Sequence, residues 1–485
     1  MMKPGIKPKM KPATRHSSMC GMCGEKSSDI KKRRCESMNV LFSNRDLKRL
    51  ILPLIIEQFL QCFVGLADSL MVATVGEAAV SAVSLVDTVF LLLINVFAAL
   101  ATGGAVVAGQ ALGRKDEEGG CAAANQLIVF VALLASLIMA LIYLGRGFLL
   151  HTVFGDIAAD VRESSNLYLL IVAASIPFIA VYNAGAAIFR SMGNSRVSMI
   201  SAMVMNAVNL VGNALLIFGF HRGIEGVAIP TLLSRVTACA IILKLLSDPQ
   251  WKLHLPRPFS FRLNMASLKQ ILYIGIPNGL ENGMFHLGKI VILSLVASFG
   301  TASIAANAVA NNVTTFAYLP ATAIGYAMLT VVAQCIGARD YDQARLYTKK
   351  LMKLTYLALL ISNGIVVLIT FPVLHAYHLS AEATQLARNV ILYYCLCCIT
   401  IYPPSFSLPN ALRAAGDVTF AMIAAVVSMW VFRIGASYIL ADWLHWGLFG
   451  VWVAMTIDWL FRGILFSFRY LRGTWQDIAE RSQPS

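Results

Sequence analysis

The chain alternates between long apolar runs and short polar segments. Twelve of these runs contain about twenty or more mostly apolar residues. Because an α-helix rises 1.5 Å per residue, about twenty apolar residues cross the hydrocarbon core of a bilayer. The pattern therefore predicts twelve membrane-spanning helices, at residues 50–73, 80–110, 122–144, 165–189, 197–218, 226–246, 268–297, 303–335, 350–374, 386–411, 417–440 and 447–468.

The composition also indicates a membrane protein. Of the 485 residues, 58% are apolar and only 13% are charged, whereas about a quarter of the residues in a soluble domain are charged. The first 49 residues are polar and lack the apolar core and cleavage site of a secretory signal, so we expect no signal peptide there.

The distribution of positive charge predicts the orientation in the membrane. Of the 39 Lys and Arg residues, 31 lie in or at the edge of the segments that would be inside if the N-terminus is inside. Four lie at the outer side, namely Arg146, Arg162, Arg222 and Arg388. This asymmetry places both termini in the cytoplasm. The net charge of +14 is explained by this same asymmetry, since basic residues on the cytoplasmic side face anionic lipid headgroups. We therefore expect no nucleic-acid partner.

The ten cysteines do not indicate a metal site. Seven lie in or beside predicted spans, where cysteine serves as a small apolar residue, and Cys20, Cys23 and Cys35 lie in the N-terminal segment. One Cys-x-x-Cys pair and one distant cysteine are too few to close a zinc site. We expect that segment to be a reduced, disordered tail.

The second half of the chain repeats the first. A shift of 224 residues superimposes polar residues and glycines in order, and the segment "FRSMG" (189–193) matches "LRAAG" (412–416). Six crossings in each half give both halves the same orientation, so a pseudo-two-fold axis along the membrane normal relates them. The superimposed pairs include Pro53 and Pro277, Glu57 and Glu281, Gln110 and Gln334, Gly113 and Gly337, and Asp116 and Asp340.

The predicted fold is therefore an all-α polytopic membrane protein of twelve helices in two six-helix lobes. We expect a cytoplasmic basic tail over 1–46, the N-terminal lobe over 47–246 and a cytoplasmic linker over 247–267. The C-terminal lobe follows over 268–470, with a cytoplasmic C-terminal tail over 471–485.

Five motifs make the chain similar to a known family. They are "GLADSLMVATVG" (65–76), "GQALGRKD" (109–116), "NLVGNALLIFG" (209–219), "GVAIPTLLSR" (226–235) and "AQCIGARD" (333–340). Over about residues 45–470 the chain resembles the multidrug and toxic compound extrusion (MATE) transporters. The resemblance implies an exporter of cationic or amphipathic compounds that is driven by inward sodium or protons.

A comparison of the halves isolates a candidate cation site. Asp68 lies opposite Ile292 and Thr231 opposite Met455, so these polar side chains belong to the first half only. Asn209 and Asn213 share one face of a predicted helix. Asp68, Asn213 and Thr231 each lie about five residues from the outer end of a predicted span. A single carboxylate with neutral oxygen donors suits a small cation, and the same carboxylate could carry a proton.

In the MATE resemblance, the positions that match Asp68, Asn209, Asn213 and Thr231 form the cation site of the N-terminal lobe. Asn213 stands where some members have a second aspartate, which leaves one formal charge. Two alternatives remain open at this point. Ser69 or the backbone could satisfy Asp68, and the asparagines could serve only as interhelical hydrogen-bonding groups.

Other charged and polar residues within the predicted spans have both structural and functional interpretations. Glu57 and Glu281 are expected near helix N-termini, where the helix dipole stabilises them, or at an inner gate or cavity. His286 and Lys289 are candidates for a cavity lining or for a buried structural pair. A structural charge pairing is expected among Arg433, Asp458 and Arg462.

The function we predict is a secondary antiporter of the plasma membrane that works by alternating access. We expect a monomer with no cofactor, no obligate protein partner and no metal beyond sodium at the cation site. One alternative is a lipid-linked oligosaccharide flippase, which a cavity rich in Arg and Lys would favour, but few basic residues are expected to be buried. Another is a membrane-embedded enzyme, but the chain has no Walker loop, H-E-x-x-H or G-x-S-x-G motif.

Overall fold

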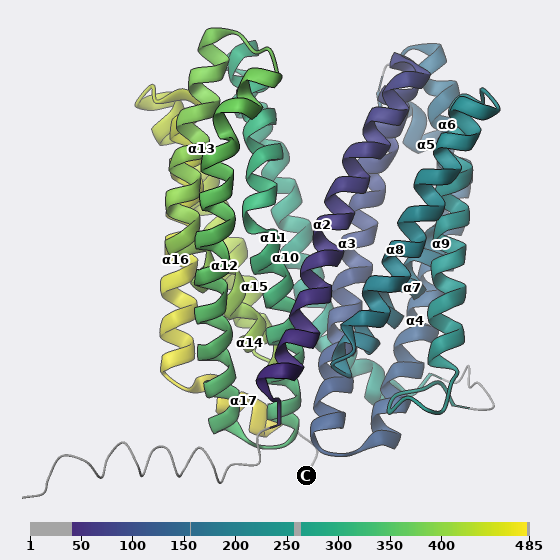
Figure 1. Ribbon diagram of the computed structural model, residues 1–485, viewed down its shortest axis with the longest axis vertical. Helices are drawn as coiled ribbons and strands as arrows, with labels where there is room; N and C mark the ends of the chain where they lie inside the picture. The colour runs from purple at the N-terminus through teal and green to yellow at the C-terminus, as the bar shows by residue number, and fades with distance from the viewer. Residues whose placement is uncertain (1–40, 156, 257–262, 483–485) are drawn as a thin grey trace, which may run out of the picture. The chain divides into compact units, whose positions relative to one another are not determined.

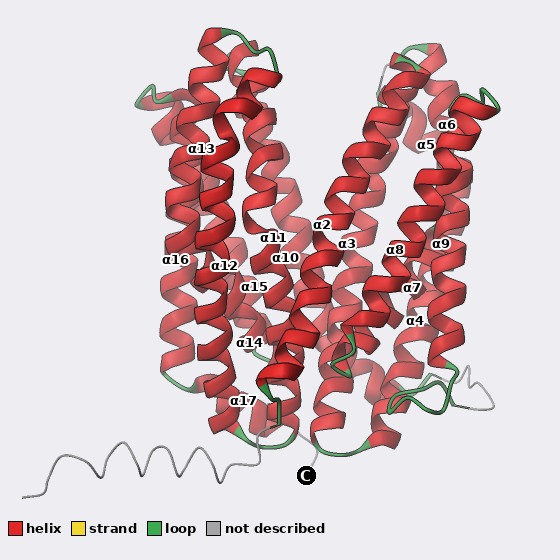
Figure 2. Ribbon diagram, viewed as in Figure 1, coloured by secondary structure: helices red, strands yellow, loops and turns green. Residues whose placement is uncertain are grey.

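The computed structural model describes residues 41–155, 157–256 and 263–482, and these residues are almost entirely helical (Figure 2). Residues 1–40 of the tail predicted over 1–46, with Cys20, Cys23 and Cys35, lie outside the described residues. The first half comprises α2 (Asn44–Val75), α3 (Glu77–Gly113), α4 (Glu117–Leu144), α5 (Arg146–Phe148), η1 (Leu149–Val153), α6 (Ala159–Ala173), α7 (Ile176–Ser191), α8 (Ser195–Ala214), η2 (Leu215–Gly219) and α9 (Glu225–Leu246), where η marks a π-helical segment.

The second half repeats this order with more irregular final helices. It comprises α10 (Met265–Ala297), α11 (Thr301–Gly337), α12 (Tyr341–Ala376), α13 (Ala381–Tyr402), η3 (Pro403–Ser407), α14 (Leu408–Ala414), α15 (Val418–Val427), η4 (Ser428–Gly435), η5 (Tyr438–Trp443), α16 (Gly447–Leu471) and α17 (Thr474–Ser482). The prolines at 403 and 404 open η3, which fits their inability to donate the regular helical hydrogen bond.

The membrane spans agree with the sequence pattern. Within the described ranges, eleven helical stretches are long and apolar enough to cross a bilayer, and a twelfth span is formed if α6 and α7 cross together. These two helices are bent by 46° at a short break. Pro177 lies in the first turn of α7, where a residue without an N–H group is tolerated. The prediction of an all-α polytopic fold is confirmed, but the span predicted at 165–189 is a broken helix.

Two groups of helices form the two predicted lobes within the described residues from Phe42 onward (Figure 1). In the first lobe, α3 packs on α7 and α2 packs on α8, and in the second lobe α11 packs on α12 and α13. Between the lobes, α10 packs along α3 and α11 packs along α2. The first helix of each lobe therefore contacts the second helix of the other, as a pseudo-two-fold axis requires.

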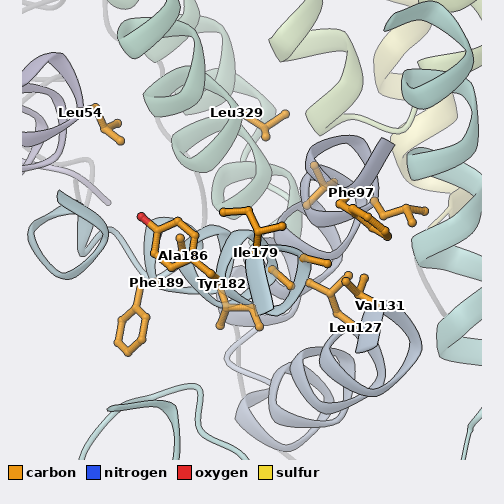
Figure 3. Close-up of a cluster of buried hydrophobic side chains, with 14 of the residues drawn as sticks. Leu54, Phe97, Leu127, Val131, Ile179, Tyr182, Ala186, Phe189 and Leu329 are labelled. Carbon is orange, nitrogen blue, oxygen red and sulfur yellow. The ribbon is translucent and has the colours of Figure 1, made fainter. Parts of the chain in front are cut away.

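Small side chains and large apolar ones fill the first lobe's core (Figure 3). Phe97 of α3, Leu127 of α4 and Ile179 of α7 are buried in one cluster, and Leu329 of α11 reaches the same cluster from the second lobe. Lipid is as apolar as these side chains, so close van der Waals packing rather than exclusion from water holds such helices together.

The segment predicted as a linker packs against the first lobe. Trp251 contacts the ring of Phe189 edge-on at 5.5 Å, and Leu253 and Leu255 are buried. The helix α10 already begins at Met265, inside the range predicted for the linker.

The repeated Gln-x-x-Gly-x-x-Asp block joins the lobes. Gln110 donates from Nε2 to the carbonyl oxygen of Ala414 at 2.9 Å, and its counterpart Gln334 donates to the carbonyl oxygen of Ser191 at 2.6 Å. Each bond runs from a glutamine of one lobe to the backbone of the other. Since Ser191 and Ala414 are equivalent in the repeat, the two bonds are related by pseudo-symmetry.

The glycines of the block allow the two backbones to approach. A Cβ atom at Gly113 would overlap the carbonyl oxygen of Gln334, and one at Gly337 would overlap the carbonyl oxygen of Gln110. We call Gln110, Gly113, Gln334 and Gly337 the interlobe clasp. The aspartates of the block have a local role, because Asp116 and Asp340 accept backbone hydrogen bonds at the starts of α4 and α12.

The clasp predicts the effect of one added methyl group. Gly337→Ala should lower the thermal stability of the purified protein by an amount equivalent to about 1–3 kcal/mol, because its Cβ meets a rigid backbone carbonyl. Gly364→Ala in α12 is the control, since no atom lies within 4 Å of its added Cβ. Equal melting temperatures for the two variants in detergent would contradict the proposed role of the clasp.

Candidate functional site

The four residues proposed for cation coupling lie on three adjacent helices of the first lobe. Asn213 of α8 donates from Nδ2 to Oδ1 of Asp68 on α2. One turn earlier on α8, Asn209 donates from Nδ2 to Oγ1 of Thr231 on α9 at 3.2 Å. Asn213 is fully buried, Thr231 is nearly so, and Asp68 is partly buried. The structure thus brings the four side chains together in two hydrogen-bonded pairs.

The arrangement leaves one acceptor oxygen of Asn213 without a partner in the described part of the chain. Oδ1 of Asn213 is buried and has no hydrogen-bond partner among the described residues. The alternative partner for Asp68 is otherwise engaged, because Ser69 donates to the carbonyl oxygen of Gly65 within its own helix at 2.9 Å. Carboxylate and amide oxygens of this kind are the ligands that small hard cations prefer.

A second carboxylate and a guanidinium lie in the same lobe, and the sequence reasoning missed both. Tyr168 of α6 donates to Oδ1 of Asp87 on α3 at 3.2 Å. Arg235 of α9 donates from Nη1 to Oγ of Ser175 at 2.7 Å. The charge of Arg235 acts on both Asp68 and Asp87. The lobe therefore combines two carboxylates with one partly buried positive charge.

The same comparison of halves could have found these residues. Asp87 is a carboxylate inside the span predicted at 80–110, and Asn311 occupies the equivalent position in the second half. Arg235 lies four residues after Thr231, on the same face of the helix. Asp87 and Arg235 have no oppositely charged neighbour nearby in the sequence. The signal that could have found them is their position within membrane spans, where a charged side chain needs a partner.

Glu57 and Glu281 form equivalent ion pairs in the two lobes. Arg190 Nη1 lies 3.6 Å from Oε1 of Glu57, and Ser198 donates to the other carboxylate oxygen at 2.7 Å. Arg413 donates from Nη2 to both carboxylate oxygens of Glu281, at 2.8 and 2.7 Å. Both arginines come from the matching segments "FRSMG" and "LRAAG", so the duplication has kept the whole pair.

These pairs correct one expectation. Glu57 and Glu281 were expected near helix N-termini, but α2 begins at Asn44 and α10 at Met265. Both glutamates lie several turns into their helices. Since the dipole effect is confined to the first turn, the arginines rather than the helix ends stabilise these carboxylates.

A cavity of about 280 Å³ lies between α3 and the second lobe. Glu281 and its partner Arg413 form part of its wall, whereas Glu57 does not line it. The lining residues are Asn95, Ala98, Ala99, Thr102, Asn278, Glu281, Asn282, Phe285, Tyr326, Leu329, Ser405, Phe406, Asn410, Arg413, Ala425, Val426, Met429 and Arg462. Asparagines, aromatic residues and arginines make up half of this lining, and small or aliphatic residues most of the rest, which suits an amphipathic ligand.

His286 and Lys289 do not form the structural pair that was one of the two expectations. His286 Nε2 lies 2.9 Å from Nδ2 of Asn95 on α3, across the interface between the lobes. The ammonium of Lys289 lies 5.0 Å from the ring centre of Phe285. Among the residues that the structure describes, no carboxylate forms an ion pair with Lys289.

Asp458 lies between the two arginines that the sequence paired with it. Arg433 Nε is 3.2 Å from one carboxylate oxygen and Arg462 Nε is 3.3 Å from the other. Ser428 also donates to the carboxylate. Arg433 and Arg462 are both buried, so the expectation of few buried basic residues underestimated the second lobe. The guanidinium of Arg462 stacks 4.5 Å over the ring of Phe406 at the cavity.

Known proteins share this fold and sequence pattern. A family model described as MatE matches residues 53–215 and 277–439, which are the two halves in the register that the repeat predicts. The chain is 27% identical over 430 residues to the "Uncharacterized transporter YisQ" of Bacillus subtilis, covering 87% of this chain and 93% of that protein. It is 24% identical over 447 residues to the "Probable multidrug resistance protein NorM" of Thermotoga maritima, covering 90% and 94%.

A solved structure agrees with the fold. It is described as the outward-facing conformation of a multidrug resistance MATE family transporter of the MOP superfamily, and it matches with a TM-score of 0.80. The match has 21% sequence identity and covers 89% of this chain and 96% of that one. At this identity the likeness establishes the fold alone.

The ion pair at the cavity predicts strong coupling between its members. Glu281→Gln and Arg413→Gln should each destabilise the protein by about 3 kcal/mol, because each leaves a partly buried charge without its partner. The double variant should lose much less than the sum of the two. Unfolding of the purified protein in detergent measures all three, and the exposed pair Arg222 and Glu225 serves as the control. Additive losses at Glu281 and Arg413 would contradict the coupling.

Proposed function

We propose that this chain, which belongs to the MatE family, is a secondary antiporter that exports amphipathic small molecules in exchange for inward sodium or protons. The family consists of transporters rather than enzymes. The observation that carries the proposal is the bond between Asn213 and Asp68 in only one of two equivalent lobes, in a chain that also has a cavity lined by residues of both lobes. Residues that occur in both lobes belong to the shared scaffold, so residues that bind the coupling ion are expected among those that occur in one lobe only.

The coupling cation would bind at Asp68. Its carboxylate supplies one negative charge, and the unpartnered amide oxygen of Asn213 supplies a neutral ligand. A single charge with neutral donors holds a monovalent cation weakly enough for release. Arg235 limits the affinity further, because its charge repels any cation close to Asp68 and Asp87. A proton on Asp68 would satisfy the same requirement.

Alternating access would act through the interlobe clasp. The positive-inside distribution supports cytoplasmic termini in the plasma membrane, and Gly113 and Gly337 then lie at the cytoplasmic ends of α3 and α11. With the clasp closed on that side, the described arrangement corresponds to an outward-facing state. Export requires the clasp to open, which breaks both cross-lobe glutamine bonds.

One observation favours the flippase alternative. Arg413 and Arg462 line the cavity, and a basic cavity suits the anionic headgroup of a lipid-linked sugar. Arg413 is neutralised by Glu281, however, and the volume of about 280 Å³ is small for a sugar headgroup. The antiporter therefore remains the better-supported proposal.

The carboxylate of Asp68 should be essential for coupled transport. Asp68→Asn keeps the shape of the side chain and one acceptor oxygen for Asn213 but removes the charge, so gradient-driven efflux should fall by at least tenfold while the protein still folds. Ser69→Ala is the matched control, because that hydroxyl bonds only within its own helix. Efflux from vesicles containing each variant gives the comparison, and full activity of Asp68→Asn would refute the coupling role.

Separate gradients should identify the coupling ion. In proteoliposomes, one of two separately imposed gradients, sodium or pH, should drive substrate efflux, and the other should not. The gradient that drives efflux identifies the coupling ion. Dissipating that gradient with an ionophore should stop accumulation. Transport of substrate under neither gradient, with lipid-linked sugars still translocated, would favour the flippase instead.

A further inference from the structure

The second lobe gathers positive charge around the cavity. We propose that this cavity binds the anionic group of an amphipathic substrate, such as a carboxylate or phosphate, and that Lys289 and Arg462 provide the charge that selects it. The inference rests on the proposed transport function, whose substrate class it specifies. It replaces the expectation of cationic substrates, which came from the family resemblance alone.

The two lobes differ in charge once their shared parts are removed. Each lobe has one Glu–Arg pair, and these pairs are equivalent and neutral. Among the charged groups of the first lobe that lie away from the ends of the spans, Asp68, Asp87 and Arg235 remain, with a net charge of −1.

In the second lobe, one remaining charged group lines the cavity and three contact lining residues, with a net charge of +2: Arg462 lines it, Lys289 and Arg433 contact Phe285, and Asp458 pairs with Arg462. The charges that are specific to each lobe are therefore opposite in sign. A cation is favoured at the first lobe and an anion at the second.

The carboxylates at the cavity are not free to bind a cationic ligand. Glu281 receives two hydrogen bonds from Arg413. Asp458 is shared by Arg433 and Arg462, so one negative charge faces two positive ones. A cationic substrate would have to break one of these pairs, whereas an anionic group can join the excess positive charge without breaking any.

Lys289 is not itself a lining residue, but it lies one helical turn beyond the lining residue Phe285 on the same face of α10. Glu281 and Phe285 both line the cavity, and residues 281, 285 and 289 follow each other at intervals of four on α10. The lysine is exposed, forms no ion pair among the described residues and contacts the Phe285 ring through its ammonium. Its charge is therefore available to a ligand at the rim of the cavity.

Aromatic rings beside these charges define the rest of the ligand. Phe285, Phe406 and Tyr326 line the cavity, and Arg462 stacks on Phe406. A flat apolar ring system can pack on these side chains while its acidic group meets the cations. The volume of about 280 Å³ accommodates a small aromatic acid.

Two probes with the same ring and opposite charge test the proposal. Binding of 2-naphthoate and of 2-naphthylmethylammonium to the purified full-length protein in detergent can be measured by titration calorimetry at neutral pH. Naphthoate should bind more tightly than the ammonium compound. Lys289→Gln should weaken naphthoate binding about tenfold, and Lys289→Arg should retain it. Lys353→Gln should have no effect, because it changes an exposed lysine on α12, a helix that contributes no residue to the cavity lining.

Three results would overturn the proposal: no binding of naphthoate, tighter binding of the ammonium probe, or unchanged naphthoate binding in Lys289→Gln. Displacement of naphthoate by a long-chain alkyl phosphate would assign the anion site to a lipid headgroup, and retention of naphthoate would assign it to a soluble amphiphile. No gradient is present in this experiment. A protein that binds naphthoate as expected but shows no coupled transport would therefore contradict the antiport function and not the anion site.

Discussion

Every charged side chain within the membrane helices has to be matched by another polar group, because hydrocarbon offers no partner. This constraint explains the internal organisation of the molecule better than its apolar packing does. Glu57 and Glu281 are held by arginines of the fourth span in their own lobes, and Asp458 is held by two arginines at once. Where the matching is incomplete, as at Asn213 and Lys289, a ligand can complete it.

A comparison of the two duplicated halves separates the scaffold from the polar groups that lack a full set of partners. The Glu–Arg pairs and the interlobe clasp occur in both halves, and both stabilise the scaffold or join the lobes. The cluster around Asp68 and the cationic cluster around Asp458 each occur once. If the first lobe selects the cation and the second the anion, as we propose, ion and substrate would occupy different sites and would interact through the frame that both lobes share.

The sequence predicted the spans and the duplication well, because each depends on local apolar length or on residues matched in order. It also placed Asp68 and Asn213 on facing helices through their depth. It could not identify Arg190 and Arg413 as partners of the glutamates, since pairs more than 130 residues apart leave no local pattern. The break between α6 and α7 was likewise missed, because a bent pair of helices has the same apolar length as a straight one.

The central claim is that one carboxylate in the first lobe carries the coupling cation. Infrared difference spectroscopy of the protein in lipid, recorded as sodium or protons are added, observes that carboxylate directly. The account predicts a change in a carboxylate stretching band that is present in the wild type and in Asp87→Asn but absent in Asp68→Asn. A band that persists without the Asp68 carboxylate would contradict the account.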